Sequence, residues 1–154
     1  MLKKSIALGT LVVVALISMF SLRPLSDSYN DKDLNAFSID NALLHINQIA
    51  NSPHHASHPN HEAVKNYILS YLNKLGLETQ IQEGFSHNPK WKSVVYNKNI
   101  LARIKGTSNT KALMLLSHYD SNPHSAPGAS DAAVGVATIL EGLTAYLAKE
   151  KEPK

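Results

Sequence analysis

Residues 112–121 read Ala-Leu-Met-Leu-Leu-Ser-His-Tyr-Asp-Ser. Five apolar residues in a row are typical of a short strand that is buried on both faces, although a buried helical segment gives the same pattern. The polar residues Ser117 to Ser121 would then lie at the carboxyl end of that strand. In open α/β sheets this end is where ligands bind. We therefore expect an α/β domain with its chemistry close to His118 and Asp120.

The segments on either side of this run have the periodicities of an α/β layout. The expected elements, in chain order, are helices over 38–50 and 60–75, strands over 77–81, 99–105 and 112–116, and a helix over 132–149. Ser38 and Asn60 are suitable N-caps for the first two helices, and Gly76 is a suitable stop for the second. A turn is expected at 106–109, and a loop rich in proline, glycine and serine at 123–130.

The N-terminus has the composition of a membrane segment. Lys3 and Lys4 precede an uncharged run from Ser5 to Leu22, which Arg23 ends. As a helix this run is roughly 27 Å long, close to the ~30 Å hydrocarbon core of a bilayer. It is longer than the apolar part of a signal peptide and lacks a small-x-small cleavage site. We therefore favour an uncleaved signal anchor over a cleaved signal peptide or a buried core helix.

The expected organisation is a signal anchor at 1–23, a polar tether at 24–36 and a domain at 37–154. The lysines before the apolar run favour a cytoplasmic N-terminus by the positive-inside rule. The domain would then lie on the periplasmic, extracytoplasmic or lumenal side of the membrane.

Composition limits the class of protein. Of the 154 residues, 44% are hydrophobic and 18% are charged, which indicates an ordered globular domain. The formal charge of +3 comes partly from lysines near the two ends. No basic face with interleaved aromatic residues lies between them, so we expect no nucleic-acid partner. Because the chain has no cysteine, disulfides and thiolate metal ligands are excluded.

A histidine and an aspartate two residues apart can act together at a metal ion. His118 can offer a neutral ring nitrogen to Zn²⁺, and Asp120 can accept the proton of the other ring nitrogen, which fixes the tautomer and orientation. Asp131, at the start of the last helix, can return a carboxylate whose two oxygens bridge two metal ions. Alone, a His-x-Asp triplet carries little weight, because most histidines at loop edges are solvated or hydrogen-bonded.

The wider pattern resembles a known family. Its parts are Leu-Ser-His-Tyr-Asp-Ser at 116–121, Gly-Ala-Ser-Asp at 128–131, Gly-Val-Ala at 135–137 and Leu-Glu at 140–141. This arrangement is similar to the family-28 metallopeptidases, the zinc aminopeptidases related to vacuolar and endoplasmic-reticulum membrane proteases. Upstream, a Pro-His-rich loop begins at Pro53, and a helix ends in Leu-Gly-Leu at 75–77. Both features resemble the N-terminal part of the same family's domain. The resemblance covers about residues 37–149, and its 118–141 part is specific.

The resemblance implies a three-layer αβα zinc-aminopeptidase fold, of which 37–154 would be the N-terminal part. It also implies two zinc ions in a complete domain and peptides as substrates. His118 would be a zinc ligand, Asp120 would orient its ring, and Asp131 would be the ligand shared by both ions. One departure is Ala132, where the family often has Asp or Asn. That residue is not normally a ligand, but the change puts the geometry of the local loop in question.

The rest of the family's site has no counterpart after Glu141. The family has a Glu-Glu pair on its next strand, which supplies the general base and a ligand, and a later carboxylate and histidine. Residues 150–154 read instead as a solvated charged tail. Metal-assisted hydrolysis needs a zinc-activated water and a base, so we expect a truncated domain that is inactive alone.

Two other functions stay open. The layout of His118 and Asp131 also resembles glutaminyl-peptide cyclotransferases, which share the fold but use one zinc ion. A non-catalytic membrane-anchored relative is the second alternative. Retention of both residues together with Asp120 argues against it, because metal ligands are usually lost first.

Other polar and aromatic residues receive plainer interpretations. The histidines at 54, 55, 58 and 61 are expected in a solvated loop. His61-Glu62 does not continue into a His-Glu-x-x-His zinc helix, because position 65 is Lys65. Glu141 is expected at the surface or behind the site. Trp91 and Tyr96 are expected either at a substrate rim or in surface packing.

Overall fold

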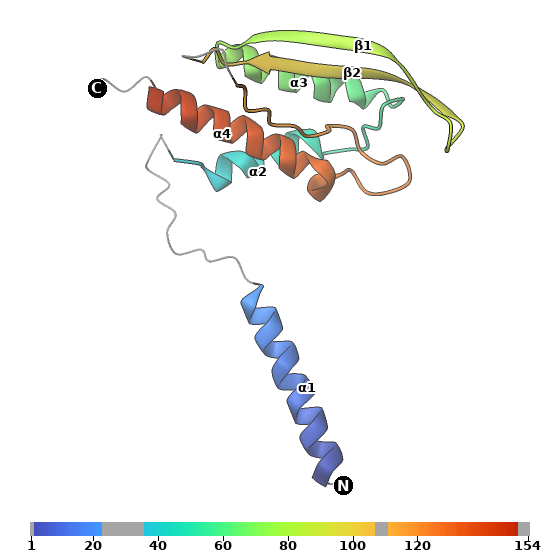
Figure 1. Ribbon diagram of the computed structural model, residues 1–154, viewed down its shortest axis with the longest axis vertical. Coiled ribbons are helices and arrows are strands. Elements are labelled where there is room, and N and C mark those ends of the chain that lie inside the picture. Colours follow the sequence, from blue (N-terminus) through green and yellow to red (C-terminus); the bar gives the residue numbers. More distant parts are fainter. Residues whose placement is uncertain (1, 23–35, 107–110, 151–154) are drawn as a thin grey trace. The chain divides into compact units, whose positions relative to one another are not determined.

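A computed structural model of the chain describes residues 2–22, 36–106 and 111–150. Its elements are α1 (Leu2–Ser21), α2 (Ile39–Ile49), α3 (Asn60–Lys74), β1 (Glu78–Asn88), β2 (Ser93–Arg103), η1 (Ala129–Ala133) and α4 (Val134–Glu150) (Figure 1). The chain divides into two compact units, Met1–Asp31 and Lys32–Lys154. Most of the expected tether and turn, and the end of the tail, lie outside the described residues.

The first unit contains α1, a 20-residue helix without an acidic residue in its first turn. Its segment Lys4–Ser21 is long and apolar enough to cross a membrane, and its side chains are exposed. The segment Ala129–Lys149 passes the same length and composition test, but one third of it is buried. We assign the latter to the core of the domain.

The N-termini of α2 and α3 are stabilised differently. Ser38 caps α2 as expected, because its Oγ accepts a hydrogen bond from the Asn41 N–H at 3.2 Å. The expected cap of α3 is wrong: Asn60 is the first residue of the helix, and its side-chain amide donates to Ser52 Oγ at 2.6 Å. Pro59 occupies the cap position with φ −54°, a value that its ring imposes and that suits the start of a helix.

The end of α3 is the stop expected at Gly76. This glycine has φ +80°, a conformation that disfavours any residue with a Cβ. Its N–H donates to Asn73 O at 2.9 Å, and the N–H of Leu77 donates to Leu72 O at 3.2 Å. These two bonds form a Schellman motif, which turns the chain out of α3 and into β1.

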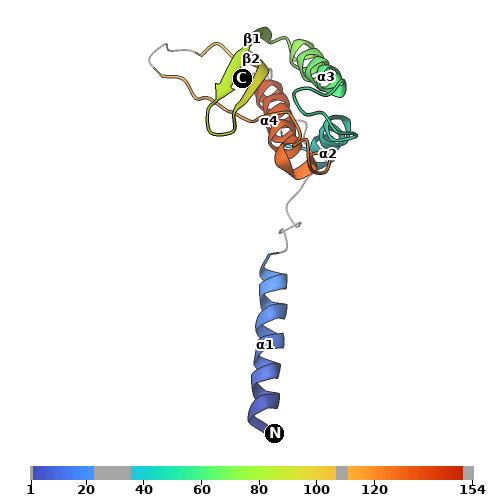
Figure 2. The same cartoon turned by 90° about the vertical axis from the view of Figure 1, so that its right-hand side faces the viewer.

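The two strands form one antiparallel hairpin, with register from Glu78↔Arg103 to Asn88↔Ser93. The sequence predicted only its base, because alternation is clear only where one face is buried. Ile81 and Ile100 are opposite each other there, and Ile100 packs against the core. Beyond α3 the hairpin has no core beneath it, so its outer half shows little periodicity. The hairpin packs against α3, and Figure 2 shows α4 extending below both of them towards α2.

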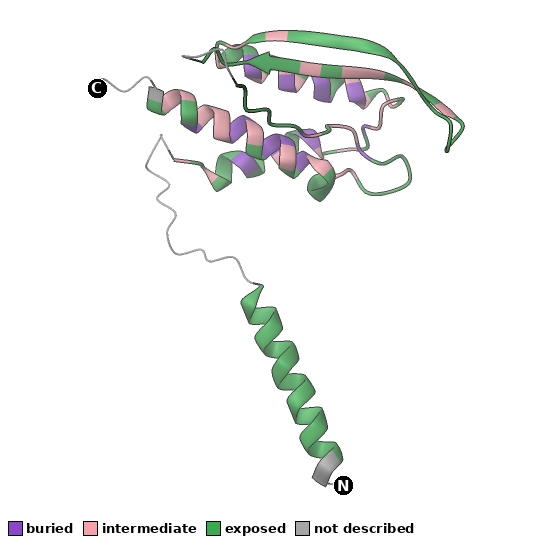
Figure 3. Ribbon diagram, viewed as in Figure 1, coloured by how far each residue is buried: buried purple, intermediate pink, exposed green. Residues whose placement is uncertain are grey.

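The core lies where α2, α3 and α4 meet (Figure 3). Its buried members are Ile49, Val64, Ile68, Leu72, Ala133, Val136 and Leu140. Each fully buried aliphatic side chain of this kind stabilises the fold by roughly 1.5–3 kcal/mol. In α2, Leu43 is 49% exposed, whereas the buried face of the helix carries Ala42, His45 and Ile49.

The strand expected at 112–116 is also absent. This segment runs alongside α4 without regular secondary structure (Figure 1), and Leu113 and Leu116 are 90% and 83% exposed. A strand needs neighbours for its backbone N–H and C=O groups. Within the described residues, however, the sheet consists of β1 and β2 only. The apolar run is thus present without the partners that would make it a buried strand.

Glu141 is buried, so of its two expected positions, at the surface or behind the site, the surface position is wrong. Its side chain is in α4 with 2% exposure, and its Oε1 accepts hydrogen bonds from the Ser38 N–H at 3.0 Å and from Asn41 Nδ2 at 3.4 Å. A carboxylate at the N-terminus of α2 also complements the dipole of that helix. Glu141 therefore ties α4 to α2. The fold class is α/β, as the sequence predicts.

Candidate metal centre

The structure brings the three predicted site residues together. His118 Nδ1 lies 3.2 Å from Asp120 Oδ1 and 3.2 Å from the backbone oxygen of the same residue. His118 Nε2 lies 3.0 Å from Asp131 Oδ1. The side chains of His118, Asp120 and Asp131 are 56%, 47% and 80% exposed. The imidazole is therefore held at both nitrogens while its face stays open to solvent.

The surroundings of His118 favour its protonated form. Partial burial lowers the pKa of its ring, but the backbone oxygen and the carboxylate of Asp120 outweigh that effect, with help from Asp131, so the pKa is raised. With Asp120 holding the Nδ1–H, a proton on Nε2 can be shared with Asp131. A metal ion bound between Nε2 and the Asp131 carboxylate would take the place of that proton.

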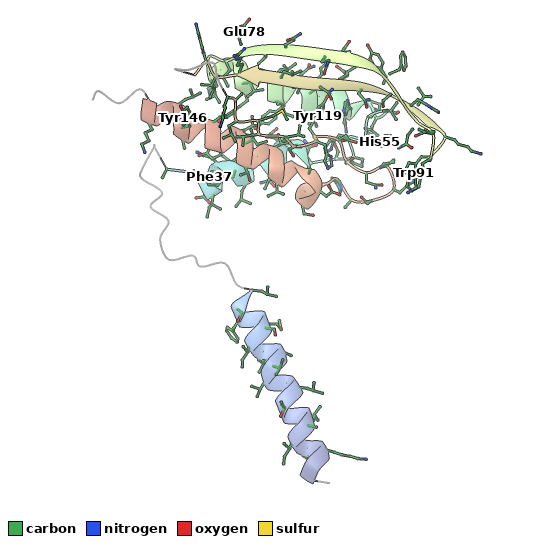
Figure 4. All side chains as sticks on the ribbon, viewed as in Figure 1. Phe37, His55, Glu78, Trp91, Tyr119 and Tyr146 are labelled. Carbon is green, nitrogen blue, oxygen red and sulfur yellow. The ribbon has the colours of Figure 1, made fainter. Side chains whose placement is uncertain are left out.

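Tyr119, the middle residue of the His-Tyr-Asp triplet at 118–120, attaches that triplet to β2 and α3. Its hydroxyl donates to Lys98 O in β2 at 2.7 Å, and its ring stacks on His61 of α3, with centroids 4.8 Å apart. Figure 4 shows Tyr119 beneath the hairpin. Burial, followed by the negative charges of Glu62, Asp120 and Glu83, raises the pKa of Tyr119 to about 12, so the hydroxyl remains a donor.

Two of the four histidines that were expected in a solvated loop are buried, and one of these two, His61, lies in α3. His54 is 1% exposed and His61 is 6% exposed. The backbone N–H of His54 donates to Ser121 Oγ at 2.9 Å, and the His54 ring Nδ1 lies 2.9 Å from Ser52 O. Burial lowers the pKa of His61 against the opposing charges of Asp120 and Glu62, so this ring is neutral at pH 7. The loop supports the segment that carries His118.

An ion-pair group joins α3 to β2 next to this support. Glu62 binds Lys65 at 2.5 Å, and its other oxygen binds Lys98. Hydrogen bonds from Lys65 and then Lys98 lower the pKa of Glu62 to about 2. Because the Glu62 side chain is 46% exposed, water screens these charges and the group adds little to stability. The group links α3 to Lys98, the residue whose backbone oxygen accepts the Tyr119 hydroxyl.

Gly128 and η1 determine where Asp131 lies. Gly128 has φ +83°, and a Cβ at this position would lie 2.7 Å from Asp131 O and 3.3 Å from the Cβ of Ser121. The Ala133 N–H closes the turn by donating to Gly128 O at 3.0 Å. Asp131 and Ala132 have non-helical dihedral angles within the turn. Ala132 differs from the residue that the family often has at this position. The loop nevertheless places the Asp131 carboxylate next to His118.

The donor pair suits zinc in kind. An imidazole nitrogen and a carboxylate oxygen are two of the ligand types that Zn²⁺ accepts, and Zn²⁺ takes four ligands in closed sites. Among the described residues, no group of three or more histidine, cysteine, aspartate or glutamate side chains is placed to hold a metal ion. His118 and Asp131 supply two donors of these kinds.

The C-terminal part of the chain matches a known family. The family model for Peptidase family M28 matches residues 99–154. A vacuolar membrane protease from Laccaria bicolor is 30% identical over 153 residues, covering 92% of this chain and 15% of that protein. Another from Candida tropicalis is 36% identical over 126 residues, covering 75% of this chain and 14% of that protein. The chain thus spans about one seventh of these relatives.

Solved structures with the same fold span two kinds of enzyme. A Zn-dependent exopeptidase from Parabacteroides distasonis has a TM-score of 0.64 and 25% identity, over 75% of this chain and 44% of that one. A leucine aminopeptidase precursor from Bacteroides thetaiotaomicron has a TM-score of 0.64 and 26% identity, over 79% and 45%. A glutaminyl cyclase from Porphyromonas gingivalis has a TM-score of 0.65 and 24% identity, over 75% and 41%.

The chain is therefore related to the family-28 zinc metallopeptidases. Within that family, the relatives that it matches along most of its length are vacuolar membrane proteases. The resemblance that the sequence motifs indicated is confirmed, as is the fold.

Replacing Gly128 by alanine tests how the loop places Asp131. Gly76 is a matched control, because it has nearly the same φ (+80°) but nothing within 4 Å of an added Cβ. We expect Gly76→Ala to cost about 1 kcal/mol of unfolding free energy for the backbone conformation alone. Gly128→Ala should cost about 2–3 kcal/mol, because the added Cβ also displaces the Asp131 carbonyl. Urea denaturation measures both losses, and ring NMR signals of His118 should shift only in Gly128→Ala. Equal losses with unchanged His118 signals would contradict this account of the loop.

Proposed function

We propose that this protein is a zinc-dependent peptidase, and more specifically an aminopeptidase that removes N-terminal residues from peptides. The observation that carries the proposal is the position of the His118 ring between two carboxylates, with Nε2 3.0 Å from Asp131 Oδ1. Family membership supplies the reaction class. The zinc exopeptidase and leucine aminopeptidase precursor among the solved relatives support the exopeptidase assignment.

The roles follow from the contacts. Asp120 accepts the Nδ1–H of His118 and so presents Nε2 as the metal ligand. Asp131 supplies a carboxylate oxygen to the same ion. Its side chain is 80% exposed, which leaves its second oxygen accessible to a second ion. Bound zinc would activate a water molecule for attack on the peptide carbonyl.

The remaining ligands and the general base are proposed to lie beyond residues 1–154. His118 and Asp131 provide fewer donors than a zinc site needs, and the described part of the chain holds no third ligand placed to join them. The protein that tests the function is therefore one extended to the length of its solved relatives, of which this chain covers 41–45%.

A glutaminyl-peptide cyclotransferase is the second candidate. The Porphyromonas gingivalis glutaminyl cyclase has a TM-score of 0.65, as high as that of either peptidase relative. The two activities differ in their products from a peptide with N-terminal glutamine. An aminopeptidase releases free glutamine, whereas a cyclotransferase leaves a pyroglutamyl peptide. Metal content also separates them, because the peptidase proposal requires two zinc ions.

Two aspartate variants distinguish metal ligation from orientation of the ligand. In the extended protein, Asp120→Asn should lower zinc affinity roughly 10–100-fold, because it removes the charge that holds the ring of His118. Excess zinc should restore much of the aminopeptidase activity. Asp131→Asn should lose the second zinc ion, and added zinc should restore almost none of the activity. Zinc content and peptide hydrolysis are measured across a zinc titration.

His55→Ala serves as the control, because the ring of His55 contacts that of His58 and is not among the side chains proposed to bind or orient the metal ion. It should retain both zinc affinity and activity. The assignment of roles is wrong if the two aspartate variants respond identically to added zinc.

We further propose that α1 anchors the protein in a membrane, with the domain on the extracytoplasmic or lumenal side. The length and apolar composition of Lys4–Ser21 support anchoring, as do the membrane proteases among the relatives. The lysines that precede the apolar run support the orientation.

Carbonate washing of membranes from cells that produce the protein tests the anchor. We expect the protein to stay in the membrane pellet at its unprocessed size, since a helix that spans the bilayer resists carbonate extraction. A variant without residues 1–23 should be released into the supernatant. Recovery of the intact protein in the soluble fraction, at a mature and shorter size, would show that the segment is a cleaved signal peptide.

A further inference from the structure

The outer half of the β1–β2 hairpin, residues 85–96, exposes large apolar side chains. We refer to it as the hairpin tip. Phe85 is 79% exposed, Trp91 is 72% exposed and Val94 is 64% exposed. Phe85 is opposite Tyr96 in the register, with ring centroids 4.8 Å apart. Figure 4 shows Trp91 at the end of the hairpin, and Glu78 marks its opposite end.

The hairpin tip is also basic. Lys90 and Lys92 flank Trp91, and Lys90 Nζ lies 5.7 Å from the centroid of the Trp91 ring. No aspartate or glutamate occurs in residues 84–119, whereas this stretch contains six lysine or arginine residues. The tip therefore combines exposed aromatic rings with a positive charge that no acidic residue in the tip balances. This corrects the expectation from the sequence that no basic face with interleaved aromatic residues lies between the two ends of the chain.

This combination suits the interface of an anionic bilayer. Tryptophan favours the headgroup level of a membrane, where its ring is apolar and its N–H can still meet water. Lysines close to an anionic surface are attracted to it, and their long stems let the apolar side chains sink deeper. A bilayer would remove Phe85, Trp91 and Val94 from water without leaving Lys90 and Lys92 unpaired.

We propose that the hairpin tip binds the surface of a bilayer that contains anionic lipids. Trp91 and Phe85 enter the boundary between headgroups and acyl chains, and Lys90 and Lys92 contact lipid phosphates. The proposed peptidase function does not require this contact. Once α1 is in a membrane, the tip meets lipid at a high effective concentration, so a weak intrinsic affinity is sufficient.

The chain provides its own probe, because Trp91 is its single tryptophan. The full chain is reconstituted into vesicles of phosphatidylcholine alone or of phosphatidylcholine with phosphatidylserine. In each case the acyl chains are either unmodified or brominated, and both leaflets have the same composition, so the orientation of the protein does not matter. We expect Trp91 emission to shift to the blue and to be quenched by bromine in the phosphatidylserine vesicles. Added salt should reduce both effects.

Paired charge variants test whether the tip itself is responsible. Lys90→Gln/Lys92→Gln should weaken the lipid-bound state about fivefold for each lysine, so that most of the blue shift is lost. Lys105→Gln/Lys111→Gln removes the same charge outside the tip and should leave the shift largely intact. Phe85→Ser should reduce the quenching by bromine while all four lysines remain.

Three results would overturn the proposal. The first is a Trp91 emission spectrum that remains typical of a water-exposed indole in vesicles of every composition. The second is equal loss of the blue shift in the two lysine pairs, which would mean a general attraction of the whole domain. The third is a blue shift produced by substrate peptides without lipid and not by lipid, which would assign the tip to the substrate rim. The carbonate test of α1 is independent of all three.

Discussion

Carboxylates contact both ring nitrogens of His118. The packing of the surrounding segments is what brings these carboxylates to the ring. Asp120 belongs to the same short segment, so its contact follows from local geometry. Asp131 lies 13 residues further on and reaches Nε2 because the loop returns at Gly128. A carboxylate on Nδ1 selects the tautomer whose other nitrogen binds metal. The placement of His118 between the two carboxylates is therefore a property of the fold itself.

The segment that carries His118 is fixed to the rest of the domain by the residues that follow His118. Tyr119 points away from its two neighbours, binds the backbone of β2 at Lys98 and stacks on His61. Ser121 accepts the N–H of His54. Successive side chains of this short segment thus face different ways: His118 is exposed to solvent, and Tyr119 contacts the core. Burial of His54 and His61 is the consequence of this support.

Sequence motifs predicted which polar side chains lie together better than they predicted the strands. His118, Asp120 and Asp131 could be found because short-range spacing and one loop bring them together. The hairpin beyond its base could not, because strand periodicity appears only where one face is buried. The predicted strand at 112–116 failed for a related reason: its apolar composition is real, but a strand also needs backbone partners. The burial of Glu141 depends on how α4 packs against α2, which no local pattern records.

The central claim is that Asp120 fixes His118 so that Nε2 is the metal-binding nitrogen. Nitrogen-15 NMR of the His118 ring, in protein extended to the length of its solved relatives, tests this claim directly. On titration with zinc, Nδ1 should remain protonated and bound to Asp120, while the Nε2 resonance should move to the position of a metal-bound nitrogen. A metal-bound Nδ1, or a His118 ring that does not respond to zinc while the protein still binds it, would contradict the account.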